Sequence, residues 1–67
     1  MFWLINNRLK EVRMKEYMMK PQEFARYIDV NCKTYYSWEQ GIVNPSLQTA
    51  LNVAKKLNKK VEDIWYI

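Results

Sequence analysis

The sequence contains one glycine, Gly41, and two prolines among its 67 residues. Tight turns rely on these residue types, because glycine adopts positive φ without strain and proline fixes the first corner of a turn. An all-β fold of this length would need many such turns, so the composition argues against one. Apolar residues (49%) and aromatic residues (15%) are typical of a folded domain and not of a disordered segment. We therefore expect a single, mainly helical domain over residues 1–67.

Charge and cysteine content restrict the partners and the compartment. Eleven basic and seven acidic residues give a formal net charge of +4, which permits an acidic partner such as nucleic acid but also serves solubility alone. The single cysteine, Cys32, cannot form an internal disulfide, which favours a reducing compartment. The apolar start is too short for a signal peptide or a membrane span. We expect a cytoplasmic protein with no membrane partner.

Apolar residues recur at helical spacing in five places, and each recurrence predicts a helical segment. The expected segments are residues 6–17, 21–29, 32–40, 47–57 and 61–65, the last of them only one or two turns long. Asn31 and Ser46 are strong N-cap residues for the third and the fourth. In the fourth, the expected apolar face is Leu47, Ala50, Leu51, Ala54 and Leu57. In the first, it is Ile5, Leu9 and Val12, with Asn6 or Asn7 as the cap.

Both ends of the chain are apolar, with FWLI near the start and IWYI at the end. These stretches are short and rich in residues that favour strands. They are expected either to pair as a two-stranded antiparallel ribbon or to bury against a second copy of the chain. An isolated pair of strands is only marginally stable, so packing against helices or a partner would be required.

Gly41 directly follows the third helical segment. A helix end requires a residue with positive φ, so Gly41 is expected to be the helix C-cap, as in many helical proteins. Its neighbourhood is more informative, because a turn of about three residues, 29–31, joins the second and third segments. Two short helices joined by so tight a turn form the helix-turn-helix layout.

Residues 19–57 carry an ordered set of positions: Met19, Lys20, Pro21, Glu23, Phe24, Ala25, Asp29, Val30, Asn31, Tyr35, Trp38, Glu39, Gln40 and Gly41, followed by Asn44 to Leu47, Thr49, Leu51, Ala54 and Leu57. In this order they resemble the Cro/C1-type helix-turn-helix domain, the xenobiotic response element family of bacterial and phage repressors. Each element alone is a weak signal, but their order and near-fixed spacing make a strong one. The resemblance covers about residues 7–65.

Three positions depart from the family pattern. Pro21 stands where the family often has a glutamine that holds a phosphate, so that contact is expected to be missing. Asp29 replaces the turn glycine, although aspartate tolerates the left-handed region better than most residues. One extra residue lies in KEYMMK, so the first helix is expected to run longer or to end in a bulge.

The resemblance implies an all-α, five-helix, lambda-repressor-like domain with its helix-turn-helix at about residues 20–40. It implies a regulator that binds the major groove of double-stranded DNA in a sequence-specific way. A repressor acting as a homodimer on a pseudo-palindromic operator is expected, because a bare DNA-binding domain can occlude a promoter but offers little surface for recruiting polymerase. The alternative is a protein-interaction module on the same fold, such as an antitoxin or an adapter.

The third helix would enter the major groove, so the residues facing away from Val30, Tyr35 and Trp38 are the candidates for base readout. They are Cys32, Lys33, Tyr36 and Ser37. Lys33 can donate to guanine O6 or N7, although a solvated lysine is nearly as good an interpretation. Cys32 is either a small groove-facing side chain or inert.

Phosphate contacts are expected from Lys20, Gln22, Asn31, Gln40 and Asn44. The densest basic cluster, Lys55, Lys56, Lys59 and Lys60, is interpreted first as a solvated face. The resemblance also implies a partly buried structural ion pair between Arg13 and Glu39. Trp3, Trp65 and Tyr66 are the candidate dimer surface, unless the termini only close the core of the monomer.

Enzymatic activity is not expected. The chain has no histidine, no glycine-rich phosphate loop and no carboxylate pair in a suggestive setting. A zinc site lacks ligands, because Cys32 has neither a histidine nor a second cysteine beside it. We expect no metal, no cofactor and no small-molecule ligand.

Overall fold

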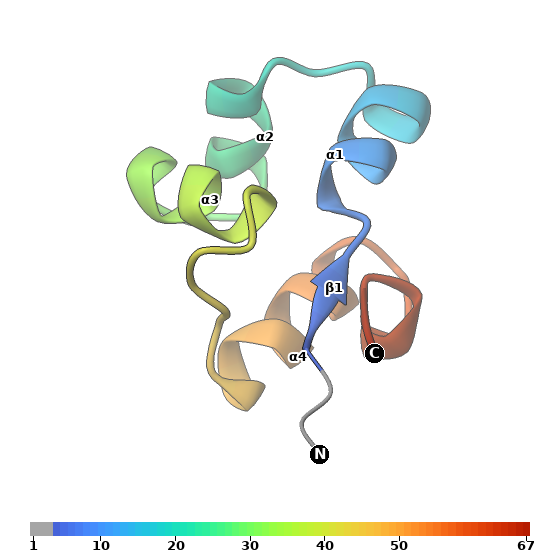
Figure 1. Cartoon of the computed structure of the whole chain (residues 1–67). Coiled ribbons are helices and arrows are strands. Elements are labelled where there is room, and N and C mark those ends of the chain that lie inside the picture. The colour runs from blue at the N-terminus through green and yellow to red at the C-terminus, as the bar shows by residue number, and fades with distance from the viewer. Residues whose placement is uncertain (1–3) are drawn as a thin grey trace.

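The computed structural model describes residues 4–67 and places four α-helices in them (Figure 1). They are α1 (Leu9–Val12), α2 (Pro21–Tyr27), α3 (Cys32–Glu39) and α4 (Leu47–Lys56). The other elements are the π-helical segment η1 (Arg13–Tyr17), the 3-10 turn η2 (Val61–Asp63) and the strands β1 (Asn6–Asn7) and β2 (Trp65–Tyr66). The mainly helical fold is confirmed, whereas the expected count of five helices is not, because residues 4–67 hold four α-helices. The fifth expected segment, of one or two turns, forms the single 3-10 turn η2.

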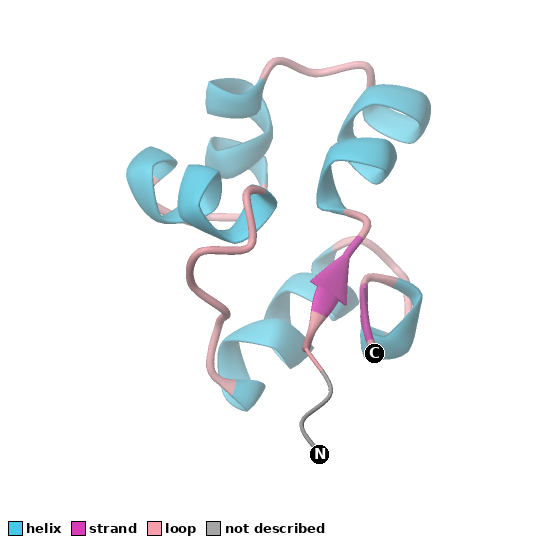
Figure 2. Cartoon of the chain, viewed as in Figure 1, coloured by secondary structure: helices cyan, strands magenta, loops and turns pink. Residues whose placement is uncertain are grey.

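The chain before α1 is a strand and not the start of a helix. Asn6 lies opposite Tyr66 and Asn7 opposite Trp65 in an antiparallel pair (Figure 2), and the Arg8 N–H donates to the carbonyl of Ile64 at 2.8 Å. The expected terminal ribbon is therefore present, but the two asparagines form its first strand. Phe2 and Trp3 of the expected FWLI strand lie outside the described residues.

Asn7 explains why the helix begins later than expected. Its side-chain Nδ2 donates to the carbonyl of Trp38 at 2.7 Å, and its Oδ1 accepts from the Leu9 N–H at 3.2 Å. Asn7 therefore ties the ribbon to the end of α3 while its backbone stays extended. Ile5 precedes this strand and is exposed, so it does not share the buried face of Leu9 and Val12.

The extra residue in KEYMMK is absorbed by η1, as a bulge. The carbonyl of Arg13 accepts the N–H of Met18 five residues later, and the N–H of Met19 at 3.3 Å. Met18 adopts a left-handed conformation with φ of 50°. A π-helical turn of this kind widens the helix by one residue without unwinding it.

One apolar core is shared by the helices and the ribbon. It consists of Leu9, Val12, Phe24, Ala25, Ile28, Tyr35, Trp38, Ala50, Val53, Ala54, Leu57, Ile64 and Trp65. The aromatic rings of Phe24 and Tyr35 meet edge to face with centroids 5.5 Å apart, and those of Trp38 and Trp65 with centroids 6.1 Å apart. These two contacts bind α3 to α2 on one side and to β2 on the other.

The buried stripe of α4 is shifted from the expected one. Ala50, Val53, Ala54 and Leu57 are buried at helical spacing. Leu47 and Leu51 were expected in the core but are 72% and 52% exposed. The physical reason is that the core begins one turn into α4, so Leu47 lies beyond its edge and Leu51 turns away from it.

Three helices end in the same hydrogen-bonding pattern. At the end of α3, the Gly41 N–H donates to Trp38 O at 3.0 Å and the Ile42 N–H donates to Ser37 O at 2.9 Å. This Schellman pattern requires a left-handed residue, and Gly41 supplies it with φ of 79°. Asp29 after α2 and Asn58 after α4 play the same part with φ of 62° and 57°. The expected role of Asp29 as a substitute for the turn glycine is thus confirmed.

Substitution of Gly41 by alanine is expected to lower the free energy of unfolding by about 1 kcal/mol. An added Cβ would meet no heavy atom within 4 Å, so the cost comes from the left-handed backbone alone. Gly41→Asn should lose less of the free energy of unfolding, because asparagine tolerates the left-handed conformation, as Asn58 does at the end of α4. Urea denaturation of the three proteins measures the difference, and equal losses for alanine and asparagine would contradict this explanation.

Candidate nucleic-acid interface

The helices α2 and α3 form a compact unit joined by a short turn (Figure 1). Pro21 begins α2, and the Lys20 N–H donates to the Glu23 carboxylate at 2.9 Å. Asn31 caps α3, because its Oδ1 accepts from the Lys33 N–H at 2.9 Å. Buried Tyr35 then anchors α3 against α2. The sequence therefore fixes both ends of the turn and the face that α3 buries.

Of the four residues expected to read bases, Lys33, Tyr36 and Ser37 lie on the part of α3 that faces away from its buried side, whereas Cys32 packs partly against the core. Lys33 and Tyr36 are exposed, while Cys32 and Ser37 are half-buried. The Ser37 hydroxyl donates to the Lys33 carbonyl at 3.2 Å, which leaves its oxygen as an acceptor. Tyr36 exposes 40% of its surface. This face offers a cationic donor, an aromatic ring and a hydroxyl to a partner.

The residues expected to contact phosphates are exposed as a group. They are Lys20, Gln22, Asn31, Gln40 and Asn44. They flank the readout face along the chain, from the start of α2 to the loop after α3. The lysine cluster after them is partly structural, because Lys59 forms an ion pair with Glu16 at 2.9 Å and Lys56 lies over the ring of Tyr27 at 5.5 Å.

Arg13 and Glu39 are brought together by the structure. Arg13 Nε donates to Oε2 of Glu39 and Arg13 Nη2 donates to Oε1, both at 3.1 Å. The third guanidinium nitrogen, Nη1, donates to the carbonyl of Met19 at 3.0 Å. The two side chains are only 9% and 12% exposed. One guanidinium thus joins η1, the chain entering α2 and the end of α3.

The environment of this pair shifts its ionisation. Burial acts to raise the pKa of Glu39, but the hydrogen bonds and the positive charge of Arg13 outweigh it, so the net pKa is lowered below 4.5. The hydrogen bond with Glu39 raises the pKa of Arg13 against the effect of burial. Burial also raises the pKa of the neighbouring Tyr35 hydroxyl. The pair is therefore fully charged at neutral pH.

The lowered pKa of Glu39 predicts a loss of stability in acid. A carboxylate whose pKa is lower in the folded state stabilises the fold above its unfolded pKa, and this stabilisation is lost as the pH falls through the folded value. The free energy of unfolding is expected to fall as the pH drops below about 4.5, the ordinary value for glutamate. Urea denaturation between about pH 2.5 and 7 covers both the protonated and the charged form of the carboxyl. Over this range the free energy of unfolding should fall less steeply for Glu39→Gln than for the unaltered protein. Glu11→Gln, which removes an exposed carboxylate, is the control, and equal slopes for both variants would contradict the assignment.

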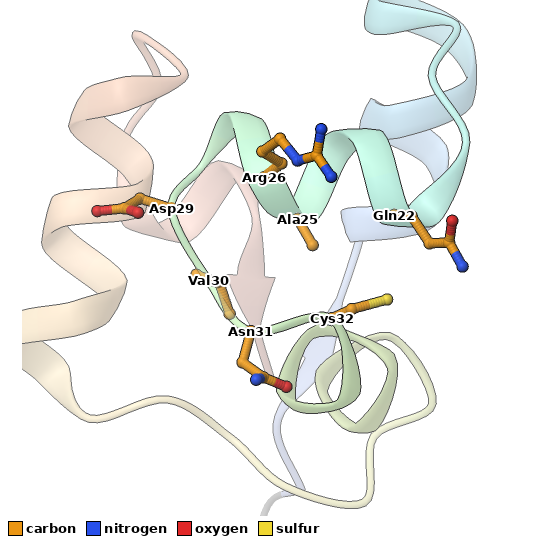
Figure 3. A pocket seen from close by; sticks show the side chains of 7 residues that line it. All are labelled: Gln22, Ala25, Arg26, Asp29, Val30, Asn31 and Cys32. Atoms are coloured by element: carbon orange, nitrogen blue, oxygen red, sulfur yellow. The ribbon is translucent and has the colours of Figure 1, made fainter.

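A shallow groove lies between α2 and the start of α3 (Figure 3). Its lining residues are Gln22, Ala25, Arg26, Asp29, Val30, Asn31 and Cys32. Three of them, Gln22, Asn31 and Cys32, were expected at the interface from the sequence. Arg26 was not, although it lies four residues after Gln22 and therefore on the same face of α2. That spacing was the signal that could have found it.

The expected dimer surface is altered by the structure. Trp65 is buried, with its ring against Trp38, so its side chain belongs to the core of the monomer and its assignment to the surface is corrected. Tyr66 remains partly exposed and lies under the guanidinium of Arg8 at 4.0 Å. Trp3 lies outside the described residues. Beside Tyr66, the side chains of Ile5 and Ile67 are exposed and line a mostly apolar hollow.

Two other kinds of site were sought in residues 4–67. No three acidic, cysteine or histidine side chains in this range gather closely enough to hold a metal ion. None of the helices in the same range has the length and apolar character needed to cross a membrane.

Comparison with known proteins gives consistent matches. Residues 9–64 match the sequence model of a family described as helix-turn-helix. An uncharacterised HTH-type transcriptional regulator of Archaeoglobus fulgidus is 38% identical over 61 residues, which cover 91% of this chain and 84% of the relative. A second uncharacterised HTH-type transcriptional regulator of the same organism is 34% identical over 61 residues, which cover 91% of this chain and 86% of that relative. Both relatives are archaeal, so the resemblance to bacterial and phage repressors does not assign a source.

Proposed function

Because this chain belongs to the Cro/C1-type helix-turn-helix family of non-enzymatic, DNA-binding transcription regulators, we propose that it is a sequence-specific repressor. It binds a pseudo-palindromic operator as a homodimer. One observation carries the proposal: α3 is capped at its start and anchored in the core by its buried side, while its opposite face presents Lys33, Tyr36 and Ser37. A helix fixed in this way can enter the major groove without losing its own packing.

In the proposed complex, α3 reads bases and the flanking polar residues hold the backbone. Lys33 donates to guanine O6 or N7, and Ser37 offers an acceptor that suits a donor on cytosine or adenine. Lys20 and Gln22 at one side, and Gln40 and Asn44 at the other, contact phosphates that fix the register. The net charge of +4 supports the encounter with DNA. Occlusion of a promoter then represses transcription.

A homodimer is proposed because a single α3 reads only a few base pairs. Two copies related by a two-fold axis would place their recognition helices about 34 Å apart, one turn of DNA. The proposed contact surface consists of Tyr66 in the terminal ribbon and the exposed residues Ile5 and Ile67 that flank its strands. Sedimentation over a range of concentrations tests this step, and a monomer at every concentration with and without DNA would refute it.

A second candidate function is a protein-interaction module, such as an antitoxin or adapter. The exposed apolar side chains of Ile42, Val43, Leu47 and Leu51 favour it, because they lie close together along the chain and none is buried in the monomer. Such residues often mark a protein contact. This segment follows α3 and lies apart from the base-readout residues, but it includes Asn44, a proposed phosphate contact, so a protein bound there would compete with that contact.

In vitro selection from a random duplex library tests the proposed function directly. Enrichment of a pseudo-palindrome, with half-sites about one helical turn apart, is the expected result. Binding that falls with salt but enriches no sequence would leave only attraction to the DNA backbone. Failure to bind DNA at low salt would contradict the proposal and favour the protein-interaction module.

A further inference from the structure

We propose that Arg26 is a further DNA-contact residue, whose guanidinium binds a phosphate of the DNA backbone beside the start of α3. The inference rests on the proposed function, because it requires the α2–α3 unit to lie on DNA. It adds a contact at the last turn of α2, in the groove that separates this helix from α3.

The position of Arg26 supports this contact. It is exposed and lies one helical turn after Gln22, on the same face of α2. Both residues line the groove together with Asn31 and Cys32. In Figure 3 the guanidinium of Arg26, the amide of Gln22 and the sulfur of Cys32 point to the same side of the groove. Cys32 begins α3, and the next residue along this helix, Lys33, is exposed.

The polar groups of the groove favour an anion. Within residues 4–67, Arg26 forms neither an ion pair nor a side-chain hydrogen bond, in contrast to Arg13. The Oδ1 of Asn31 is occupied by the Lys33 N–H, so its Nδ2 remains to donate. The one carboxylate of the groove, Asp29, points away from Arg26 and Gln22 in Figure 3. Charged and neutral N–H donors with no facing carboxylate suit a phosphate oxygen.

The position of Arg26 on α2 indicates that it contacts the DNA backbone and not a base. In a helix-turn-helix the first helix crosses the backbone while the second enters the major groove. Arg26 lies on the first of the two, α2. A competing explanation is purely structural, since a cation in the last turn of a helix interacts favourably with the helix dipole. That role would change stability but would leave DNA affinity unchanged.

Arg26→Ala, measured on an operator obtained by selection, separates these possibilities. Affinity is expected to fall about tenfold at low salt, which is the loss of one charge-assisted hydrogen bond. The slope of log affinity against log salt should decrease by about 0.9, because one phosphate contact is lost. Base preference should stay unchanged. Arg26→Lys should recover most of the slope.

The matched control is Lys15→Ala, which removes the same charge from η1, where Lys15 forms an exposed pair with Glu11 of α1. Loss of affinity no greater than in this control would overturn the inference, as would a changed base preference, which would place Arg26 at a base edge. Thermal unfolding of each variant shows whether a loss of affinity follows from a loss of stability. If the unaltered protein binds no DNA, the proposed function fails and this inference fails with it. If the unaltered protein and Arg26→Ala bind equally well, only this inference fails.

Discussion

Replacement of Arg13 by alanine is expected to destabilise the fold by about 3 kcal/mol, because it leaves Glu39 as a buried and unpaired carboxylate. Glu39→Ala should cost a similar amount for the converse reason. The domain has only 67 residues, and its total stability is expected to be in the range of about 3–10 kcal/mol. Either single variant would therefore bring the domain close to unfolding at 25 °C. Urea denaturation followed by circular dichroism measures both changes.

The loss of stability should exceed that for an ordinary ion pair, because Arg13 makes several buried contacts. Its guanidinium contacts Glu39 twice and the Met19 carbonyl once, and so joins three segments of the chain. The exposed pair of Lys15 and Glu11, at 3.5 Å, is the matched control. Its removal should change stability little, because exposed pairs are solvated in both states.

A double variant separates the cost of leaving one buried charge unpaired from the contribution of the ion pair itself. In Arg13→Met/Glu39→Met, neither charge is left unpaired, and apolar side chains of similar size replace both. This protein should be more stable than either single alanine variant. If both single variants are nearly as stable as the unaltered protein, the pair is not the structural contact that its geometry indicates. If the double variant is the least stable of all, the loss of packing and not the unpaired charge is the cause.

The sequence predicted those features of the fold that depend on local chemistry. The caps at Asn31 and Ser46 and the helix end at Gly41 follow from residues that bond to their own neighbours. The inward direction of Tyr35 and Trp38 follows from helical spacing. The bulge in η1 followed from one surplus residue relative to the family pattern.

The features that the sequence did not predict depend on contacts between distant segments. Asn7 Oδ1 accepts from the Leu9 N–H at the start of α1, as expected of a cap. Its Nδ2, however, bonds to the Trp38 carbonyl, 31 residues away, and its backbone joins the ribbon, so the helix begins two residues later. Leu47 fits the apolar pattern of α4 but lies beyond the edge of the core. Trp65 was assigned to the surface because the end of the chain is apolar, whereas its ring fills the space beside Trp38. In each case tertiary packing overrode a local preference.

The candidate site was predicted as a set of residue types, and its geometry required the structure. Helical spacing separates the exposed face of α3 from its buried face, so Lys33 and Tyr36 could be chosen from the sequence. The groove between α2 and α3 could not, because it depends on how the two helices pack. The spacing from Gln22 places Arg26 on the same face of α2, but only the structure shows that both residues line a groove with Cys32.

Lys33→Met is expected to cause the largest loss of specific DNA binding, about 1–3 kcal/mol in free energy, or roughly 5- to 150-fold in affinity. Lys33 is the cationic side chain on the exposed face of α3. Methionine retains the length of the side chain and a good helix propensity, so the helix should persist. The variant removes only the donor that would bind guanine O6 or N7. Titration of operators carrying each base at every position measures the loss.

The pattern of that loss identifies the role of Lys33. If it reads a guanine, the affinity falls for the selected operator but not for operators already altered at one particular base pair, and the preference at that pair is relaxed. Lys15→Ala should weaken binding to all operators slightly and alike, because it removes a charge remote from α3 along the chain. A uniform loss in Lys33→Met, with a salt slope reduced by about one, would instead place Lys33 at a phosphate. In that case the readout of bases would pass to Tyr36 and Ser37, which lie on the same face of α3, since Cys32 packs partly against the core.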